Sequence, residues 1–162
     1  MLAYDADLEL FRDNFKRFMK EHVAPFYEQW EREGLYPRSL WNQLGENGFL
    51  CVDVPEEYGG YGVPTHYSLM LVEESARAGY SAISTGISCH SEIAAPYILH
   101  IATEEQKQYW LPKMVSGEVV GAIGMTEPGA GSDLQAMRTS AILQGDHYVL
   151  NGSKTFISNG QH

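Results

Sequence analysis

The hydrophobic pattern of this chain changes at Gly117, and the change limits the folds that are open to it. Before Gly117, apolar residues recur every three or four positions, which is the period of an amphipathic helix. After Gly117 come short apolar runs separated by glycine and Asn-Gly turns, which is the pattern of strands. We therefore predict an α+β chain, with an all-α helical domain over residues 1–116 and the first strands of an antiparallel β domain over residues 117–162.

Several helices are predicted before Gly117. An amphipathic helix runs from Asp7 to about Trp30, and Pro25 should break it because proline lacks the backbone N–H and clashes with the preceding turn. Thr103 and Gln106 have the spacing of a capping box. The other predicted segments are a helix over 40–46 capped by Ser39, a loop over 55–64, and helices over 67–78, 83–101 and 104–115.

A small β-meander is predicted after Gly117. Residues 119–123 read as a short buried strand, and strands follow over 139–143 and 148–150. Asn151-Gly152 is a two-residue hairpin signal before a third strand over 155–158. Since so small a sheet would keep an open edge, we expect the chain to be a fragment of a larger protein.

Composition excludes several functions. The 162 residues are 44% hydrophobic, which suffices for a core, and the net charge of −10 comes without any Lys/Arg cluster, so nucleic acid and anionic membranes are disfavoured as partners. No apolar stretch is long enough for a membrane span. The acidic start, Met1 to Asp5, is unlike a signal peptide or presequence. We expect a soluble protein of the bacterial cytoplasm or, after processing, of the mitochondrial matrix.

Cysteine and histidine usage gives no sign of a metal site or a disulfide framework. Cys51 and Cys89 are two isolated cysteines, and the six histidines lack ligand spacing. Walker, Rossmann and HExxH motifs are absent from the sequence. No metal is therefore expected.

The run from Gly124 to Asp133 is the strongest candidate for a ligand site. Pro128 and the glycines at 129 and 131 allow a sharp turn that presents backbone N–H groups, so a flat or anionic ligand can approach closely. An ordinary tight loop explains the same composition. However, the run resembles the signature of the acyl-CoA dehydrogenase flavoenzymes, in which a Thr-Glu-Pro-Gly-Ala-Gly-Ser-Asp turn packs against FAD and the thioester end of acyl-CoA.

The resemblance extends through the whole chain. Members of this family have an N-terminal helical domain, a middle β domain and a C-terminal four-helix domain, and this sequence resembles the first and the opening of the second. It thus represents less than half of a typical member. The segments that carry the resemblance are Ala24-Pro25, Pro55 to Gly60, Thr103 to Lys107, the signature, and Asn151 to Lys154 through Asn159-Gly160.

The resemblance implies a set of binding residues. Thr126 and Ser158 would donate hydrogen bonds to the flavin edge, and Phe156 would pack on its ring. Each residue alone also fits a structural role as strand former, core or turn. The family pattern implies cofactor contacts at Ile123, Met125, Thr126, Gly131, Ser132, Phe156, Ile157 and Ser158, and substrate contacts at Ser132 and at Ala94, whose helix runs beside the acyl tail.

No catalytic residue is assigned within the chain. In the family, a glutamate of the C-terminal domain removes the α proton. We expect Glu127 and Asp133 instead to brace the turn through backbone hydrogen bonds. Many members have Trp-Ile-Thr where this chain has residues 156–158, Phe-Ile-Ser, and this form looks most like the long-chain branch.

The implied function is FAD-dependent α,β-dehydrogenation of medium- to long-chain acyl-CoA, with electrons passing to an electron-transfer flavoprotein in a tetrameric full-length enzyme. The 162-residue chain itself is expected to be inactive, because the base and most of the pocket lie elsewhere. One alternative is a related flavin monooxygenase or acyl-CoA oxidase. Another is a non-catalytic helical folding or interaction module.

Overall fold

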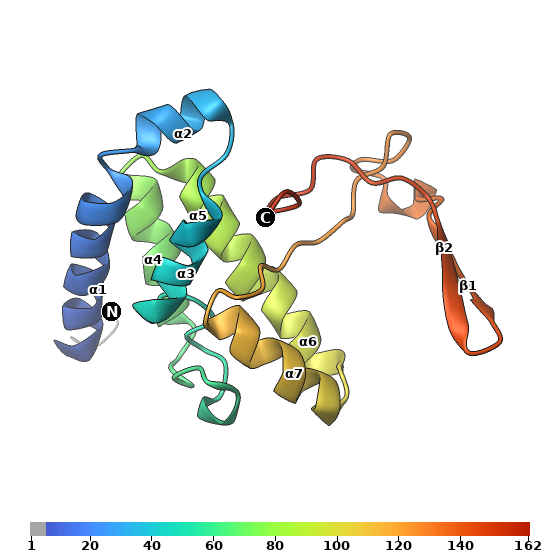
Figure 1. Ribbon diagram of the computed structural model, residues 1–162, viewed down its shortest axis with the longest axis horizontal. Helices are drawn as coiled ribbons and strands as arrows, with labels where there is room; N and C mark the ends of the chain where they lie inside the picture. The colour runs from blue at the N-terminus through green and yellow to red at the C-terminus, as the bar shows by residue number, and fades with distance from the viewer. Residues whose placement is uncertain (1–5) are drawn as a thin grey trace.

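A helical body is followed by an extended segment and a two-stranded hairpin in the computed structural model, which describes residues 6–162 (Figure 1). The acidic start, Met1 to Asp5, lies outside the described residues, and so does the expectation that rested on it. No helix in the described part of the chain is long and apolar enough to cross a membrane. The observed order, helices first and an antiparallel pair last, confirms the predicted fold class.

The first predicted helix forms, and it breaks at Pro25 as expected. Helix α1 covers Ala6–Phe18 and continues as the π-helical turn η1 over Met19–Val23. A turn that contains Pro25 follows, and α2 then covers Tyr27–Glu33. Gly34 ends α2 in the left-handed conformation at φ +72°, which glycine adopts without steric cost.

Helix α3 covers Arg38–Glu46 and begins one residue before the predicted cap. The prediction that Ser39 caps this helix is wrong, because Pro37 occupies the N-cap position with an extended backbone. The guanidinium of Arg38, the first helical residue, donates to the carbonyl oxygens of Gly117 at 2.7 Å and Glu118 at 2.6 Å. This contact ties the start of α3 to the residues where the extended segment begins.

One long helix runs through the helical body, with α4 (His66–Arg77) and α7 (Glu104–Val115) packed against it. It consists of α5 (Ser81–Ser88), the π-helical turn η3 (Cys89–Ala94) and α6 (Ala95–Ile101) without interruption. Helix α4 packs against α1 and α5, and α7 packs against α6. The loop before α4 contains a short 3-10 turn, η2, over Glu56–Tyr58. The capping box of α7 is confirmed, since the Thr103 hydroxyl and the Gln106 side chain each bond the other's backbone N–H.

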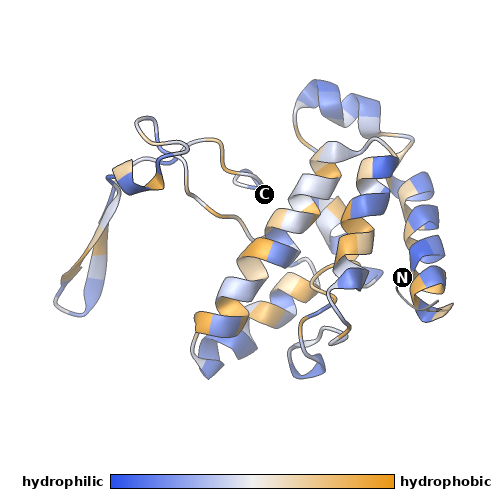
Figure 2. Cartoon of the chain, turned by 180° about the vertical axis from the view of Figure 1, so that it is seen from behind, coloured by the Kyte–Doolittle hydropathy of each residue, from blue (hydrophilic) through white to orange (hydrophobic). Residues whose placement is uncertain are grey.

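Apart from Ala130 in the glycine turn, the buried hydrophobic residues all lie within this helical body, between Phe15 and Met114. Phe49 is its aromatic centre, with ring centroids 5.4 Å from Phe11, 5.0 Å from Phe15 and 5.4 Å from Phe18. A second cluster beneath α6 and α7 includes Leu111 and Met114. Figure 2 shows the hydrophobic residues along the central helices, and it also shows hydrophobic residues on the distant hairpin.

Residues 119–123 are extended but do not form the predicted strand, so that prediction is wrong. A strand requires a neighbouring strand, and none within the described residues lies beside this segment. Its backbone bonds instead to the helical body, where Val119 N–H donates to the Lys113 carbonyl at 3.0 Å. The apolar run is therefore extended without being part of a sheet.

The sheet has two strands, β1 (Ser140–Gln144) and β2 (His147–Asn151), paired antiparallel with Ile142 opposite Val149. The predicted third strand and the hairpin at Asn151-Gly152 are absent from the described chain. The reason is that Thr155 N–H donates to the Thr126 carbonyl at 2.9 Å, which turns the chain back toward the helices. The predicted meander is thus a single hairpin.

Candidate functional site

The glycine turn is closed by the carboxylate of Glu127. The backbones of Glu127 and Ala130 exchange two hydrogen bonds across the turn, at 2.8 and 3.1 Å. The Glu127 carboxylate accepts from the backbone N–H of Arg138 at 2.7 Å and of Thr139 at 2.9 Å, and from the Lys154 ammonium at 2.9 Å. The nearby Thr139 side chain, followed by the Arg138 N–H, the Lys154 ammonium and the Thr139 N–H, lowers the pKa of Glu127 to about 2, so the carboxylate is ionised near neutral pH.

The predicted bracing role of both acidic residues is confirmed. The Asp133 carboxylate accepts from the backbone N–H of Gln135 at 3.2 Å and caps the short turn η4 (Leu134–Ala136). The Lys154 ammonium also donates to the Met125 carbonyl at 2.9 Å. The turn and the segment after β2 are therefore held together by charge-assisted hydrogen bonds.

Two segments of the chain converge on one cavity of about 350 Å³ between the signature and the helices, which we call the helix-facing cavity. From the signature segment come three of the residues predicted to bind the cofactor. From the segment after the hairpin come two more, although about thirty residues separate the two segments. The five predicted residues that line it are Ile123, Met125, Thr126, Phe156 and Ser158.

Phe156 is the least covered of these side chains. Its ring is 91% exposed, and its backbone lies in the left-handed region at φ +54°. A bulky residue pays a steric cost in that conformation. Met125 beside it is 46% exposed. The cavity is thus bordered by an aromatic ring and a thioether, both largely uncovered by the described residues.

The other predicted binding residues lie elsewhere. Ile157 lines a second cavity of about 660 Å³, shared with Ser158. Ala94 lines a third cavity of about 650 Å³ beside α6 and α7, shared with Ile123 and Met125. Gly131 and Ser132 lie in the exposed part of the turn, and neither lines any of these three cavities. The structure therefore brings five of the predicted residues together on the helix-facing cavity. It places Ile157 and Ala94 on neighbouring cavities that share some of those five, and it leaves Gly131 and Ser132 apart.

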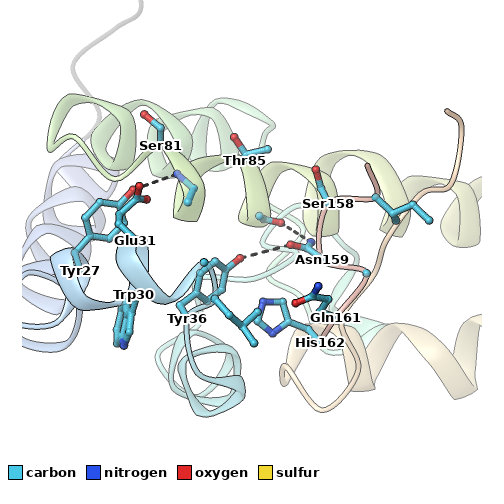
Figure 3. Close-up of a pocket in the computed structure, with 16 residues that line it drawn as sticks. Tyr27, Trp30, Glu31, Tyr36, Ser81, Thr85, Ser158, Asn159, Gln161 and His162 are labelled. Atoms are coloured by element: carbon cyan, nitrogen blue, oxygen red, sulfur yellow. Dashed lines mark hydrogen bonds between the residues drawn. The ribbon is translucent and has the colours of Figure 1, made fainter. Parts of the chain in front are cut away.

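Figure 3 shows the second cavity, in which Asn159 points inward between α5 and Tyr36. The Asn159 amide donates to the Gly86 carbonyl at 3.0 Å, and the Tyr36 hydroxyl donates to the Asn159 oxygen at 3.5 Å. Burial raises the pKa of Tyr36, so its hydroxyl remains protonated and able to donate. These contacts hold the segment that carries Phe156 and Ser158 against the helical body.

Sequence reasoning missed the helical wall of the helix-facing cavity. Ser84, Thr85 and Ser88 share one face of α5, as the spacing of i and i+4 residues requires. The signal was the run of small and hydroxyl residues at 81–88, which leaves room beside the helix. The full set of helical lining residues is Val72, Ser84, Thr85, Ser88, Cys89 and Ile93.

The described lining residues include no carboxylate and no imidazole. The thiol of Cys89 is the one acidic group among them, and burial raises its pKa, so it is protonated near neutral pH. Both cysteines are free and buried. Residues 6–162 contain no group of three His, Cys, Asp or Glu arranged to hold a metal ion. The cavity can bind and orient a ligand, but its described walls offer no general base.

Comparison with known families matches both parts of the chain. Residues 5–118 match the model for the acyl-CoA dehydrogenase N-terminal domain, and residues 122–162 match the model for the middle domain of the same family. The chain is 41% identical over 157 residues to the mitochondrial long-chain specific acyl-CoA dehydrogenase of Rattus norvegicus. That alignment covers 97% of this chain and 36% of the relative.

Solved structures agree with these matches. An acyl-CoA dehydrogenase from Geobacillus kaustophilus superposes with a TM-score of 0.93 and 48% identity, over 98% of this chain and 41% of that one. A glutaryl-CoA dehydrogenase from Mycobacterium smegmatis, in complex with FADH2, superposes with a TM-score of 0.90 and 30% identity, over 98% and 40%. The chain thus spans less than half the length of each of these proteins.

We expect Glu127→Gln to open the glycine turn. Because the folded pKa of about 2 lies below the ordinary value of 4.5, the carboxylate stabilises the fold fully above pH 4.5 and loses this effect as the pH falls toward 2. The variant should therefore melt at a lower temperature than the wild type at pH 7. Between pH 4.5 and 2, its melting temperature should fall by less than that of the wild type. The amides of Arg138 and Thr139 should exchange faster.

Glu28→Gln, at an exposed position on α2, makes the same change of charge away from the turn and serves as the control. Thermal melts across this pH range and amide exchange followed by NMR check both expectations. Identical behaviour of the two variants would show that the Glu127 contacts do not hold the turn.

Proposed function

Because the chain belongs to the acyl-CoA dehydrogenase family, we propose that it is the N-terminal part of an FAD-dependent enzyme that dehydrogenates medium- to long-chain acyl-CoA thioesters between the α and β carbons. The observation that carries the proposal is the meeting of residues from two separate segments on the helix-facing cavity. An isolated loop motif would not collect Phe156 and Ser158 beside Thr126.

The residues at this cavity fit a flavin. The isoalloxazine ring needs apolar or aromatic contact on its faces and hydrogen-bond donors at its edges. The uncovered Phe156 ring and Met125 supply the first, and the hydroxyls of Thr126 and Ser158 supply the second. FAD accepts the hydride from the substrate when it is bound in such a site. Donors fixed by the protein favour the charge that this transfer places on the ring.

The helical wall suits the acyl part of the substrate. Ser84, Thr85 and Ser88 are small side chains on the face of α5 that borders the cavity, so they leave space beside the helix. Ala94 is a second candidate for contact with the acyl tail, since the cavity that it lines beside α6 and α7 is also lined by Ile123 and Met125. Gly131 and Ser132, exposed in the turn, remain candidates for contact with the cofactor and, at Ser132, with the thioester end.

The proposal assigns the α-proton base to a part of the enzyme outside these residues. A positioned general base is worth about 10²–10⁴-fold in rate, and the described walls of the cavity carry none. The division into a helical domain over 1–116 and a β domain from 117 belongs to the same proposal. We also propose that an electron-transfer flavoprotein accepts the electrons and that the full-length enzyme is a tetramer. Its proposed compartment is the bacterial cytoplasm or the mitochondrial matrix.

Assay of the full-length protein that carries this sequence tests the proposed function. We expect a flavin absorbance band, reduction of an artificial electron acceptor with long-chain acyl-CoA, and slow reoxidation of the reduced flavin by air. Rapid reoxidation would favour the oxidase or monooxygenase instead. The 162-residue chain alone should bind FAD weakly or not at all and should reduce no acceptor. Activity of that short chain would contradict the assignment of the base to another part of the enzyme.

Phe156→Ala should weaken FAD binding in the full-length protein, because the exposed ring would lose its contact with the flavin. A pair of packed aromatic rings contributes about 0.5–1.5 kcal/mol beyond its buried area, so we expect the dissociation constant to rise by roughly threefold to tenfold. Tyr148→Ala removes another exposed ring, 64% exposed on β2 and outside the three cavities, and should leave the constant unchanged. Equal constants for both variants would remove Phe156 from the cofactor site.

Thr85→Phe should impair long acyl-CoA substrates more than short ones in the full-length protein, because the larger side chain would fill the helix-facing cavity. Ala94→Phe should do the same if the tail also passes the cavity on α6 and α7. The measurement is kcat/KM over a series of chain lengths. For either residue, an equal loss across all lengths would show that it packs the helix and does not contact the tail.

A further inference from the structure

The extended segment at residues 118–126 is attached to the helical body at Gly121. The N–H of Gly121 donates to Nδ1 of His90 at 2.8 Å, and its carbonyl oxygen accepts from the Asn159 amide at 3.1 Å. The backbone N–H and the carbonyl oxygen of Gly121 therefore both bond to side chains. In a sheet, a neighbouring strand would satisfy them.

His90 is held in one tautomer by Gly121 at Nδ1 and by the Met114 carbonyl at Nε2, where the Cys51 sulfur also lies at 3.5 Å. Nδ1 accepts the Gly121 N–H and so carries no proton, which places the proton on Nε2, 3.0 Å from the Met114 carbonyl oxygen. The side chain is 0% exposed. Burial lowers the pKa of His90 to about 4, so the ring is neutral near pH 7 and keeps the acceptor that Gly121 requires.

Asn159 completes the attachment from the other side. Its amide nitrogen donates both to Gly121 and to the Gly86 carbonyl on α5, so it bridges the extended segment and the long helix. Packing leaves no space for a side chain at position 121, since an added Cβ would lie 2.6 Å from the Ala94 Cβ and 2.8 Å from the Met114 Cε. Hydrogen bonds therefore orient the backbone of the extended segment at Gly121, and close packing against Ala94 and Met114 sets its distance from the helices.

We propose that His90 is a positioning residue. Together with Asn159 it holds Gly121 and thereby places the wall of the helix-facing cavity that residues 123–126 form, against which the flavin would bind. Within the extended segment, the residues that line this cavity begin two positions after Gly121, with Ile123, and continue through Met125 to Thr126. An extended chain advances about 3.3 Å per residue, so Ile123 lies within roughly 7 Å of the attachment point. Release of Gly121 shifts that wall relative to α5. The link to flavin rests on the proposed function, whereas the attachment itself does not.

Two substitutions of His90 separate positioning from simple packing. Asparagine places its side-chain oxygen near the position of Nδ1 and keeps an acceptor for Gly121, but it loses the contact with Met114. Glutamine carries its amide further out, near Nε2, and keeps the Met114 contact while it loses the acceptor for Gly121. Both remove the ring from the same buried site, so each serves as the matched control of the other.

The first experiment uses NMR on the 162-residue chain. It measures the hydrogen exchange of the Gly121 amide and the chemical shifts of the His90 ring nitrogens. In the wild type, the shifts should report a neutral ring with its proton on Nε2; a proton on Nδ1 would overturn the proposal without any variant. Exchange at Gly121 should be about tenfold faster in His90→Gln than in His90→Asn, as expected for the loss of one hydrogen bond. Equal exchange in the two variants would likewise overturn it.

The second measurement is the FAD dissociation constant of the full-length protein. We expect it to rise about tenfold in His90→Gln and to stay within about threefold of the wild type in His90→Asn, since only the first loses the hydrogen bond to Gly121. If both variants weaken binding equally, His90 acts through packing and the positioning role fails. If the wild type binds no FAD, the proposed function fails, and the NMR result still decides whether His90 holds Gly121.

Discussion

A buried backbone N–H or carbonyl group without a hydrogen-bond partner costs free energy, and this constraint decides how the signature segment joins the helices. The extended residues have no strand beside them within the described chain, so the helical body and the segment after β2 supply their partners. Lys113 accepts from Val119 through its carbonyl oxygen, and His90 and Asn159 satisfy Gly121. The π-helical turn η3, which carries His90, thus performs the task of a neighbouring strand.

The cavity wall is fixed at both of its ends by polar contacts of different kinds. Neutral side chains hold Gly121 at one end. At the other end, charge-assisted bonds of Glu127 and Lys154 close the turn and tie it to the segment that carries Phe156. Ile123 lies between the two anchors, so its position against the long helix depends on both.

Features set by neighbours in sequence could be predicted, and features set by distant partners could not. The break at Pro25, the capping box at Thr103 and the bracing by Glu127 each follow from chemistry within about a dozen residues. The predicted strand at 119–123 and the hairpin at Asn151-Gly152 failed because each depends on which segment lies alongside. Helical periodicity likewise shows that one face of α5 has small residues but not that this face borders the signature.

The hairpin of β1 and β2 projects away from the helical core (Figure 1), and its apolar side chains are largely exposed, among them Ile142 at 56% and Leu150 at 72%. A lone pair of strands is at best marginally stable in water. Within the described chain, the hairpin and the helical body therefore differ in their stability against local unfolding. The hairpin can fray at little cost while Phe49 and its neighbours stay packed, and its opening does not reach the anchors at Gly121. Independence of this kind lets the hairpin open and close while the packing of the helical body is unchanged.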